Sequence, residues 1–510
     1  MSENSRTKNA KRNIYSGIIK QLTQIILPFI TRTVLLYTLG VQYQGLSSLF
    51  TSILQVLNLT DLGFSSAVIY VLYKPITEND NEAICAIVNF LKVVYRYVGF
   101  IILGVGLILS FFLPSLISGD YPKDINIYIL FYIYLFNAVI SYWLFAYKSA
   151  LLTAMQREDL VSNVYSVTST IIKLVQLIIL LIIPNYYLYI LVVPVSTIAN
   201  NLLLQYYSVK HFPKVIPQGK LSIDTKNTLK KQMSGIIVNR IGDVARNGFD
   251  NIFLSVILGL TVVAVYSNYY YVYSALYGLT LTISRAVQAS VGNSIAKENR
   301  DKNYKDLLKF NFIYSWFTGW CTVCMCCLYQ PFMNIWMKGN PDMLLSNFNM
   351  VLFCIYFYAI NMNNVRNLYI SGAGLFWELR VWYIAEAIGN IVLNWCLGYW
   401  LGVSGILLAT IITIFGFNFI TRTNVLFKEY FKRSTREFYK KNLYYFIVLC
   451  IATGITYFVS EMIPFYGFVG LIIKGIICIV IPNVVFVLLF IKTKEFNDGM
   501  VLIKSLISKR

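Results

Sequence analysis

The stretch QMSGIIVNRIGDVARNGFDNIFL, Gln232 to Leu254, decides what kind of fold this chain can adopt. Both of its ends are apolar enough for a membrane helix, yet the middle carries Arg240, Asp243, Arg246 and Asp250. On a helix with about 100° per residue, these four charges fall within roughly 60° either side of Asp243. The stretch therefore predicts a membrane helix with one face of alternating charge and apolar side chains around the rest.

Two interpretations of this charged face stay open. Ionisable groups at membrane depth are expensive and seldom face lipid, so the face can line a water-filled cavity or an internal interface. Alternatively, Arg240 and Arg246 each lie within one turn of Asp243, and the charges can form a structural salt-bridge ladder that holds two helices together.

The composition of the whole chain supports a membrane protein. Its 510 residues are 57% hydrophobic and only 13% charged, with a mean hydropathy of +0.62, which excludes an ordinary soluble domain. Each membrane helix needs about 20 apolar residues, and the alternation typical of a barrel is absent. We therefore expect an all-α polytopic membrane protein with about fourteen spans, at 14–39, 45–73, 89–113, 126–147, 159–184, 188–209, 233–259, 264–296, 310–329, 345–369, 381–399, 404–425, 442–460 and 467–491.

The distribution of basic residues predicts the orientation of these spans. An even number of spans puts both termini on one side, and the tails and loops of that side carry thirty Lys and Arg residues. The loops of the opposite side carry only Lys123 and Lys338. By the positive-inside rule, both termini are expected in the cytoplasm. The net charge of +20 then lies beside anionic lipid headgroups, so no nucleic-acid partner is needed.

A weak internal repeat predicts two similar halves. Residues 36–59 and 255–279 both read Leu-Gly, a short apolar gap and then a polar, aromatic helix start. We expect a cytoplasmic tail (1–13), a six-helix lobe (14–209), a cytoplasmic loop (210–232), a second six-helix lobe (233–425), two additional helices (442–491) and a second cytoplasmic tail (492–510). In membrane proteins built from such repeats, the substrate path lies between the halves.

Polar stripes on further spans extend the charged face into a predicted cationic cavity. Arginine forks suit phosphate oxygens, and amide side chains suit sugar hydroxyls. For any single charge, a snorkelling or paired structural role is the alternative. The candidate substrate-binding residues are Arg32, Arg240, Arg246, Arg285, Lys20, Lys173, Arg366, Gln24, Gln55 and Asn58. The candidates for ion coupling are Asp61, Asp243, Asp250 and Glu386, since the one histidine, His211, lies in a cytoplasmic loop.

The sequence predicts neither a metal site nor an enzyme. The cluster CTVCMCC (321–327) lies inside a predicted span with no histidine nearby, so we interpret it as packing rather than as a metal or redox site. No nucleotide-binding loop, His-Glu-x-x-His or Gly-x-Ser-x-Gly motif is present in the sequence. We expect no cofactor.

Several stretches carry a resemblance to a known family over about 10–500. They are KRNIYSGIIKQLTQIILPFITRTVLLYTLG, QYQGLSSLFTSILQVLNLTDLGFSSAVIY, LLTAMQRED (151–159), LGLTVVAVYSNYY (258–270) and LGVSGILLATIIT (401–413). The chain resembles the Wzx-type flippases of lipid-linked oligosaccharides, in the multidrug/oligosaccharidyl-lipid/polysaccharide exporter superfamily. It departs from them in the hairpin between the fifth and sixth spans, where the family often has glycine-rich turns.

The resemblance implies a transporter that works by alternating access. Its substrate would be an undecaprenyl-pyrophosphate-linked oligosaccharide, the repeat unit of an O-antigen or capsule, moved from the inner to the outer leaflet of the membrane. Arg32, Arg240, Arg246 and Arg285 would face its headgroup. Membrane lipids and other polysaccharide-assembly proteins are the further partners that it implies.

Two other functions are the alternatives to a flippase. A drug or organic-cation exporter of the same superfamily would need a cavity biased to acidic or aromatic residues, whereas this cavity has more cations than anions. An integral-membrane polysaccharide polymerase or glycosyltransferase would need a long outer loop or clustered carboxylates, and the predicted outer loops are short.

Overall fold

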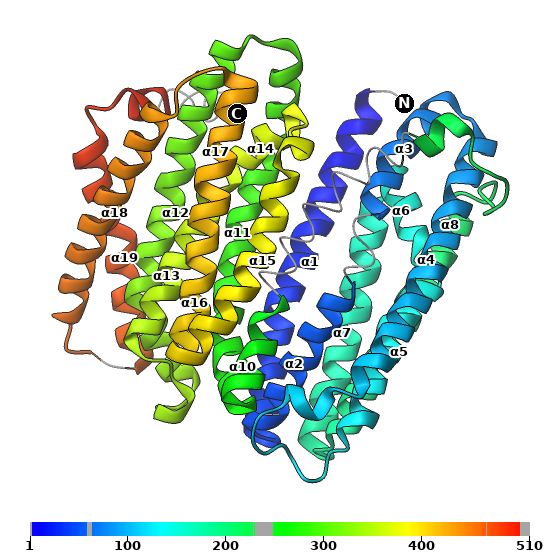
Figure 1. Ribbon diagram of the computed structural model, residues 1–510, viewed down its shortest axis with the longest axis horizontal. Helices are drawn as coiled ribbons and strands as arrows, with labels where there is room; N and C mark the ends of the chain where they lie inside the picture. Colours follow the sequence, from blue (N-terminus) through cyan, green and yellow to red (C-terminus); the bar gives the residue numbers. More distant parts are fainter. Residues whose placement is uncertain (1–2, 59–63, 228, 230–247, 466, 500–510) are drawn as a thin grey trace. The chain divides into compact units, whose positions relative to one another are not determined.

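All regular structure in the described residues is helical. The computed structural model describes residues 3–58, 64–227, 229, 248–465 and 467–499 (Figure 1). Within these ranges, nine helices are long and apolar enough to cross a bilayer. A tenth is counted if α5 (Ile127–Trp143) and α6 (Tyr147–Ala154), which are bent by 46° at their junction, form one span. The predicted fold class, an all-α multi-pass membrane protein, is confirmed.

The predicted number of fourteen spans stays a prediction. α11 (Leu260–Lys297) and α15 (Phe376–Leu401) carry internal polar residues and are not among the nine. The span expected at 45–73 corresponds to α2 (Val41–Leu57) and α3 (Phe64–Glu78), with residues outside the described ranges between them. Only the last part of the span at 233–259 is described, as α10 (Asp250–Leu258).

The chain divides into two compact units, Met1–Ala264 and Val265–Arg510, here called unit 1 and unit 2. The division falls inside α11, so each unit contains part of that helix. The other helices of unit 1 are α1 (Glu3–Thr38), α2, α3, α4 (Asn81–Ser110), α5, α6, α7 (Glu158–Ile182), α8 (Tyr186–His211) and α10. Unit 2 also contains α12 (Arg300–Trp336), α13 (Asn347–Asn361), α14 (Asn364–Ala373), α15, α16 (Val403–Thr413), α17 (Arg422–Val425), α18 (Arg436–Glu461) and α19 (Gly467–Phe490). The predicted boundaries of the six-helix lobes and of the two additional helices stay a prediction.

Close contact between helix backbones contributes to the packing of helices in both units. Lipid tails are as apolar as leucine, so membrane helices associate through packing and polar contacts rather than through the hydrophobic effect. In unit 1, a Cβ on Gly45 would lie 2.2 Å from the carbonyl oxygen of Leu260. In unit 2, a Cβ on Gly405 would lie 1.9 Å from the carbonyl oxygen of Leu397. Each glycine therefore allows a contact that any larger residue would prevent.

In unit 1, α1 packs along α7, and the two helices run in the same direction. Asn13, near the start of α1, fixes their alignment at one end. Its side-chain nitrogen donates a hydrogen bond to the carbonyl oxygen of Gln156 (3.3 Å), and its side-chain oxygen accepts one from the backbone N–H of Asp159 (2.9 Å). Gln156 has a φ of 59°, in the left-handed region, which turns the chain from α6 into α7. One side chain of α1 thus holds both sides of this turn.

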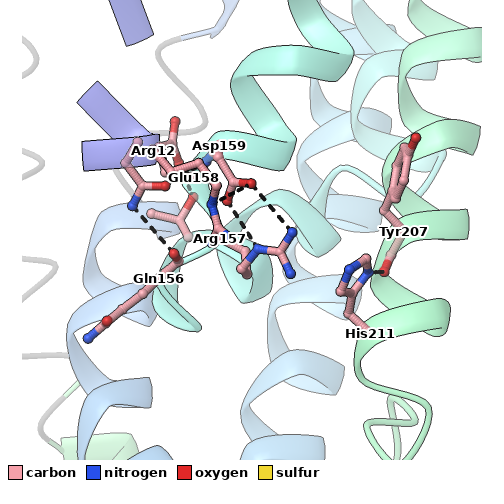
Figure 2. Close-up of polar contacts among 9 residues, drawn as sticks. Arg12, Gln156, Arg157, Glu158, Asp159, Tyr207 and His211 are labelled. Carbon is pink, nitrogen blue, oxygen red and sulfur yellow. Dashed lines mark hydrogen bonds and ion pairs between the residues drawn. The ribbon is translucent and has the colours of Figure 1, made fainter. Parts of the chain in front are cut away.

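Two arginines neutralise the carboxylate of Asp159 at the same place (Figure 2). Asp159 is only 3% exposed. Its oxygens lie 2.9 Å from Nε of Arg12, in α1, and 3.1 Å from Nε of Arg157, in the turn. A buried carboxylate needs such partners because desolvation penalises its charge. Together, Asn13, Arg12 and Asp159 anchor the start of α1 on the start of α7, and this sets which residues of the two helices face each other further along.

Replacing Asp159 tests this anchor. Asp159→Asn removes the charge shared by two arginines, and we expect it to lower the free energy of unfolding by about 1–2 kcal/mol, since both arginines are partly exposed and screened by solvent. Thermal unfolding in detergent micelles, followed by tryptophan fluorescence, measures the change. The control is Asp120→Asn, at an exposed position. Equal melting temperatures for the two variants would contradict the anchoring role.

Candidate functional site

Three of the predicted cations lie on α1 and α7, the two helices that pack together in unit 1. Lys20, on α1, places its ammonium 5.4 Å from the centre of the Tyr165 ring on α7. Arg32 lies twelve residues later on α1, so the two are separated by roughly 18 Å along the helix axis. Lys173, on α7, lies nine residues before the end of that helix, or roughly 14 Å from it. This pair of helices therefore carries positive charge at successive positions along its length.

Arg32 reaches from α1 to neighbouring helices. Its guanidinium donates a hydrogen bond to the hydroxyl of Ser48 on α2 (3.4 Å). The Tyr189 hydroxyl, on α8, lies within electrostatic reach of the same guanidinium. Arg32 is half-buried, which suits a cation that contacts protein on one side and remains accessible on another.

Lys173 is held by an amide rather than by a carboxylate. Its ammonium donates a hydrogen bond to Oε1 of Gln176, one turn further along α7 (2.8 Å). Gln176 is 1% exposed, and its Nε2 donates to the backbone carbonyl of Tyr189 on α8 (2.9 Å). Among the carboxylates that the structure describes, none forms an ion pair with Lys173 or with Lys20. The positive charge of Lys173 is thus solvated by an amide and is not cancelled by any carboxylate that the structure describes.

Hydroxyl groups line the neighbouring helices. The Tyr134 hydroxyl, on α5, donates to Ser47 of α2 (3.1 Å) and lies 3.5 Å from the Tyr186 hydroxyl of α8. Asn251, on α10, donates from its side chain to the hydroxyl of Ser52 (2.9 Å). Hydroxyls and amides can both donate and accept hydrogen bonds, and here they bind one another, with Tyr134, Tyr186 and Ser52 buried.

The polar candidates of the first two helices are not joined to these cations by any described contact. Gln24, on α1, and Gln55, on α2, are exposed, as is Asn58 just after α2. Asp250 is described and is 3% exposed, as the first residue of α10. Asp61, Arg240, Asp243 and Arg246 lie outside the described residues, and so does the side chain of Arg285. The substrate-binding and ion-coupling roles of all these residues stay predictions.

In unit 2, Arg366 is enclosed by protein. It is 1% exposed, and its guanidinium donates to the carbonyl oxygen of Phe419 (2.7 Å) and to the side-chain oxygens of Thr423 and Asn363. The same guanidinium lies 4.3 Å from the centre of the Phe419 ring. These contacts join α14 to the stretch Ile414–Thr421 and to α17. The substrate-binding role of Arg366 stays a prediction.

Glu386 and Arg422 form a buried ion pair in unit 2. The carboxylate of Glu386, on α15, lies 2.7 Å from the guanidinium of Arg422, and the two side chains are 1% and 5% exposed. The guanidinium also lies 4.4 Å from the centre of the Tyr383 ring. Arg422 lies between two π-helical stretches, Ile414–Thr421 and Leu426–Phe431. Unlike Lys173, this cation has its charge cancelled by a carboxylate.

No group of three or more metal-binding side chains is found in the part of the chain that the structure describes. The cysteines of the CTVCMCC cluster are free thiols. Cys327 is buried in the apolar core of unit 2, and Cys324 lies 3.7 Å from the carbonyl oxygen of Cys478 on α19. The cluster packs α12 against its neighbours.

The sequence interpretation missed Gln176. A signal was present, because α7 carries a polar stripe at helical spacing, with successive members three or four residues apart on one face. Its members are Ser162, Ser166, Ser169, Lys173 and Gln176. The partner that fixes Gln176, the Tyr189 carbonyl, is a backbone atom of another helix, and no sequence pattern identifies it.

The Glu386–Arg422 pair generates a stability prediction. Glu386→Leu leaves a buried arginine without its carboxylate, and we expect a loss of about 3–5 kcal/mol. The double variant Glu386→Leu/Arg422→Met removes both charges and should recover most of that loss. Thermal unfolding of the purified protein compares the two variants. A double variant no more stable than Glu386→Leu would show that the pair does not account for the loss.

Comparisons with known proteins agree with this architecture. Among solved structures, the chain is similar to lipid II flippase MurJ in an inward closed conformation, with a TM-score of 0.65 and 16% identity over 95% of this chain and 99% of that one. It is also similar to an inward-facing multidrug resistance MATE family transporter of the MOP superfamily (TM-score 0.59, 12% identity, 81% and 99% of the chains). A Vibrio cholerae MATE transporter, VcmN in the bent form, follows (TM-score 0.55, 14% identity, 84% and 99%).

At these identities, the similarities show a shared fold. No curated protein sequence matches the chain. The sequence pattern of a family described as polysaccharide biosynthesis protein matches residues 10–289. The resemblance to the exporter superfamily that the sequence suggested is therefore confirmed for family and fold. Because the matched pattern covers more than half of this chain, the chain belongs to the polysaccharide biosynthesis protein family.

Proposed function

We propose that the protein is a flippase that moves an undecaprenyl-pyrophosphate-linked oligosaccharide from the inner to the outer leaflet of a bacterial inner membrane. The family and the fold shared with a lipid II flippase support transport of a lipid-linked substrate rather than an enzymatic reaction. The single observation that carries the proposal is the positive charge on the packed helices α1 and α7. Lys20 and Arg32, on α1, and Lys173, on α7, offer this charge at several depths of membrane-spanning helices.

The physical difficulty of the reaction lies in the headgroup. A pyrophosphate cannot enter hydrocarbon without losing its hydration, and this loss is very costly for a charged group. Ammonium and guanidinium groups can replace the lost water with charge-assisted hydrogen bonds, which are about twice as strong as neutral ones. A headgroup that passes from Lys20 toward Lys173 and Arg32 meets cations at successive depths, while the polyprenyl tail remains in lipid.

The membrane potential favours the same direction. Moving two negative charges outward across an inside-negative potential of 100 mV contributes about 5 kcal/mol, if the charges cross without compensation. In this proposal, both termini lie in the cytoplasm. The tails and loops predicted on that side carry thirty Lys and Arg residues, whereas the loops of the opposite side carry two. The headgroup then enters beside Lys20 and leaves near the ends of α1 and α7.

The remaining candidates complete the proposal. Arg240, Arg246, Arg285 and Arg366 are further contacts for the phosphates, with Gln24, Gln55 and Asn58 for sugar hydroxyls. Alternating access between the two lobes exposes them first to one side and then to the other. Asp61, Asp243, Asp250 and Glu386 are the candidates for ion coupling during the return of the empty transporter. The glycan belongs to an O-antigen or capsule repeat unit.

The MATE similarity raises one competing function, export of organic cations. Lys20 and Lys173 argue against it, since no described carboxylate pairs with either ammonium and an organic cation would be repelled. The two functions are separated by substrate charge. Transport of a lipid-linked pyrophosphate supports the flippase, and efflux of a cationic dye without any flipping supports the exporter.

Vesicle transport tests the proposal directly. The full-length protein is reconstituted in liposomes, and radiolabelled undecaprenyl-pyrophosphate-linked oligosaccharide is followed from one leaflet to the other. Lys173→Gln and Arg32→Gln should each lower the initial rate by about tenfold, because each removes a charge-assisted hydrogen bond to the headgroup.

Lys220→Gln provides the matched control, because Lys220 is exposed in the loop after α8 and has the same charge. It should transport at the rate of the unaltered protein. Unaltered rates for both Lys173→Gln and Arg32→Gln, with normal reconstitution, would remove the α1–α7 interface from the transport path.

A further inference from the structure

We propose that Gln176 is a positioning residue that presents the Lys173 ammonium, with its charge uncancelled, to a phosphorylated headgroup. Gln176 thereby contributes to the selection of an anionic lipid. The inference rests on the proposed function and deepens it, because it assigns charge selectivity to a residue outside the predicted set. Gln176 does not touch the substrate in this proposal and acts only through Lys173.

The orientation of the Gln176 amide is fixed by its surroundings. Nε2 must face the Tyr189 carbonyl, because only the nitrogen can donate to that oxygen, at 2.9 Å. Oε1 then points to the Lys173 ammonium at 2.8 Å. The side chain is 1% exposed, so water does not compete for either bond. The backbone of α8 thus determines where an acceptor oxygen lies on α7.

This geometry restrains Lys173 while leaving it able to bind. An ammonium has three donor hydrogens, and Gln176 accepts one of them. Lys173 is half-buried, whereas Gln176 is fully buried, so part of the Lys173 side chain remains accessible. A lysine side chain has large rotamer entropy, and the bond to Gln176 removes part of it before the ligand arrives. Binding of the headgroup then costs less conformational entropy of the lysine side chain.

The neutral amide also leaves the positive charge intact. Unit 2 contains the contrasting arrangement, in which the Arg422 guanidinium lies 2.7 Å from the Glu386 carboxylate. The distances from cation to oxygen are nearly equal in the two pairs, but the second pair carries no net charge. A glutamate at position 176 would convert the first arrangement into the second and would compete with phosphate oxygens for the ammonium.

The test measures lipid binding by three variants of the full-length protein in detergent micelles. Undecaprenyl pyrophosphate and the uncharged lipid undecaprenol serve as probes, and dissociation constants come from native mass spectrometry. Gln176→Glu should weaken binding of the pyrophosphate about tenfold, and Gln176→Met about threefold, with undecaprenol binding unchanged in both.

Gln330→Glu is the matched control. Gln330 has the same bonding pattern in unit 2, donating to the Leu345 carbonyl at 2.9 Å and accepting from the Tyr269 hydroxyl at 2.8 Å, but its side-chain partner is uncharged. It should bind both lipids like the unaltered protein. If Gln176→Glu fails to fold beside the Tyr189 carbonyl, Gln176→Met carries the test alone.

A double-variant cycle separates positioning from a packing role. In a Lys173→Gln background, Gln176→Met should have no further effect on pyrophosphate binding, because the residue that it positions is gone. An equal effect in both backgrounds, an equal loss for both lipids, or unaltered affinities in both Gln176 variants would overturn the inference alone. If the unaltered protein does not prefer the pyrophosphate to undecaprenol, the proposed function falls, and this inference falls with it.

Discussion

The proposed transport site depends on one constraint, a positive charge inside a membrane-spanning helix that forms no ion pair with any described carboxylate. An ammonium in a low-dielectric environment is costly. At Lys173, a hydrogen bond to the buried amide of Gln176 offsets part of the desolvation cost of the ammonium. The Gln176 amide is itself hydrogen-bonded to the backbone of α8. Such an arrangement stabilises the ammonium without neutralising it, and it is suited to a ligand that brings negative charge of its own.

The interior cations of the two units differ in what surrounds them. Arg366 donates to oxygens of its own chain and lies against Phe419, and Arg422 is paired with Glu386. Both are buried, so a ligand could meet them only after these contacts broke. Lys173 is only half-buried. The alignment of α1 on α7, fixed at one end by Asn13 and Asp159, places Lys20 against Tyr165 of the helix that carries Lys173.

Local periodicity and hydropathy were enough to predict the all-α membrane fold, because those signals are carried by neighbouring residues. The cations Lys20, Arg32 and Lys173 were also identified, since a charge within an apolar run is visible in sequence. Their partners were not. The bond between Asn13 and the turn before α7 joins residues about 145 positions apart. Two acceptors of Arg366, Phe419 and Thr423, lie more than fifty positions away from it. Such contacts depend on how helices pack. The stretch that first indicated a charged interior, Gln232 to Leu254, lies largely outside the described residues, so its role rests on sequence.

The most direct measurement is the contact between Lys173 and phosphorus. Full-length protein carrying ¹⁵N in its lysine side chains is reconstituted with undecaprenyl pyrophosphate, and solid-state NMR detects dipolar coupling between ¹⁵Nζ and ³¹P. The Lys173→Arg variant, which keeps the charge but removes this ¹⁵Nζ, assigns the signal. The account predicts a ³¹P-coupled lysine signal that disappears in the variant. An identical set of ³¹P-coupled signals in both proteins would mean that the headgroup does not meet Lys173, and would contradict the account.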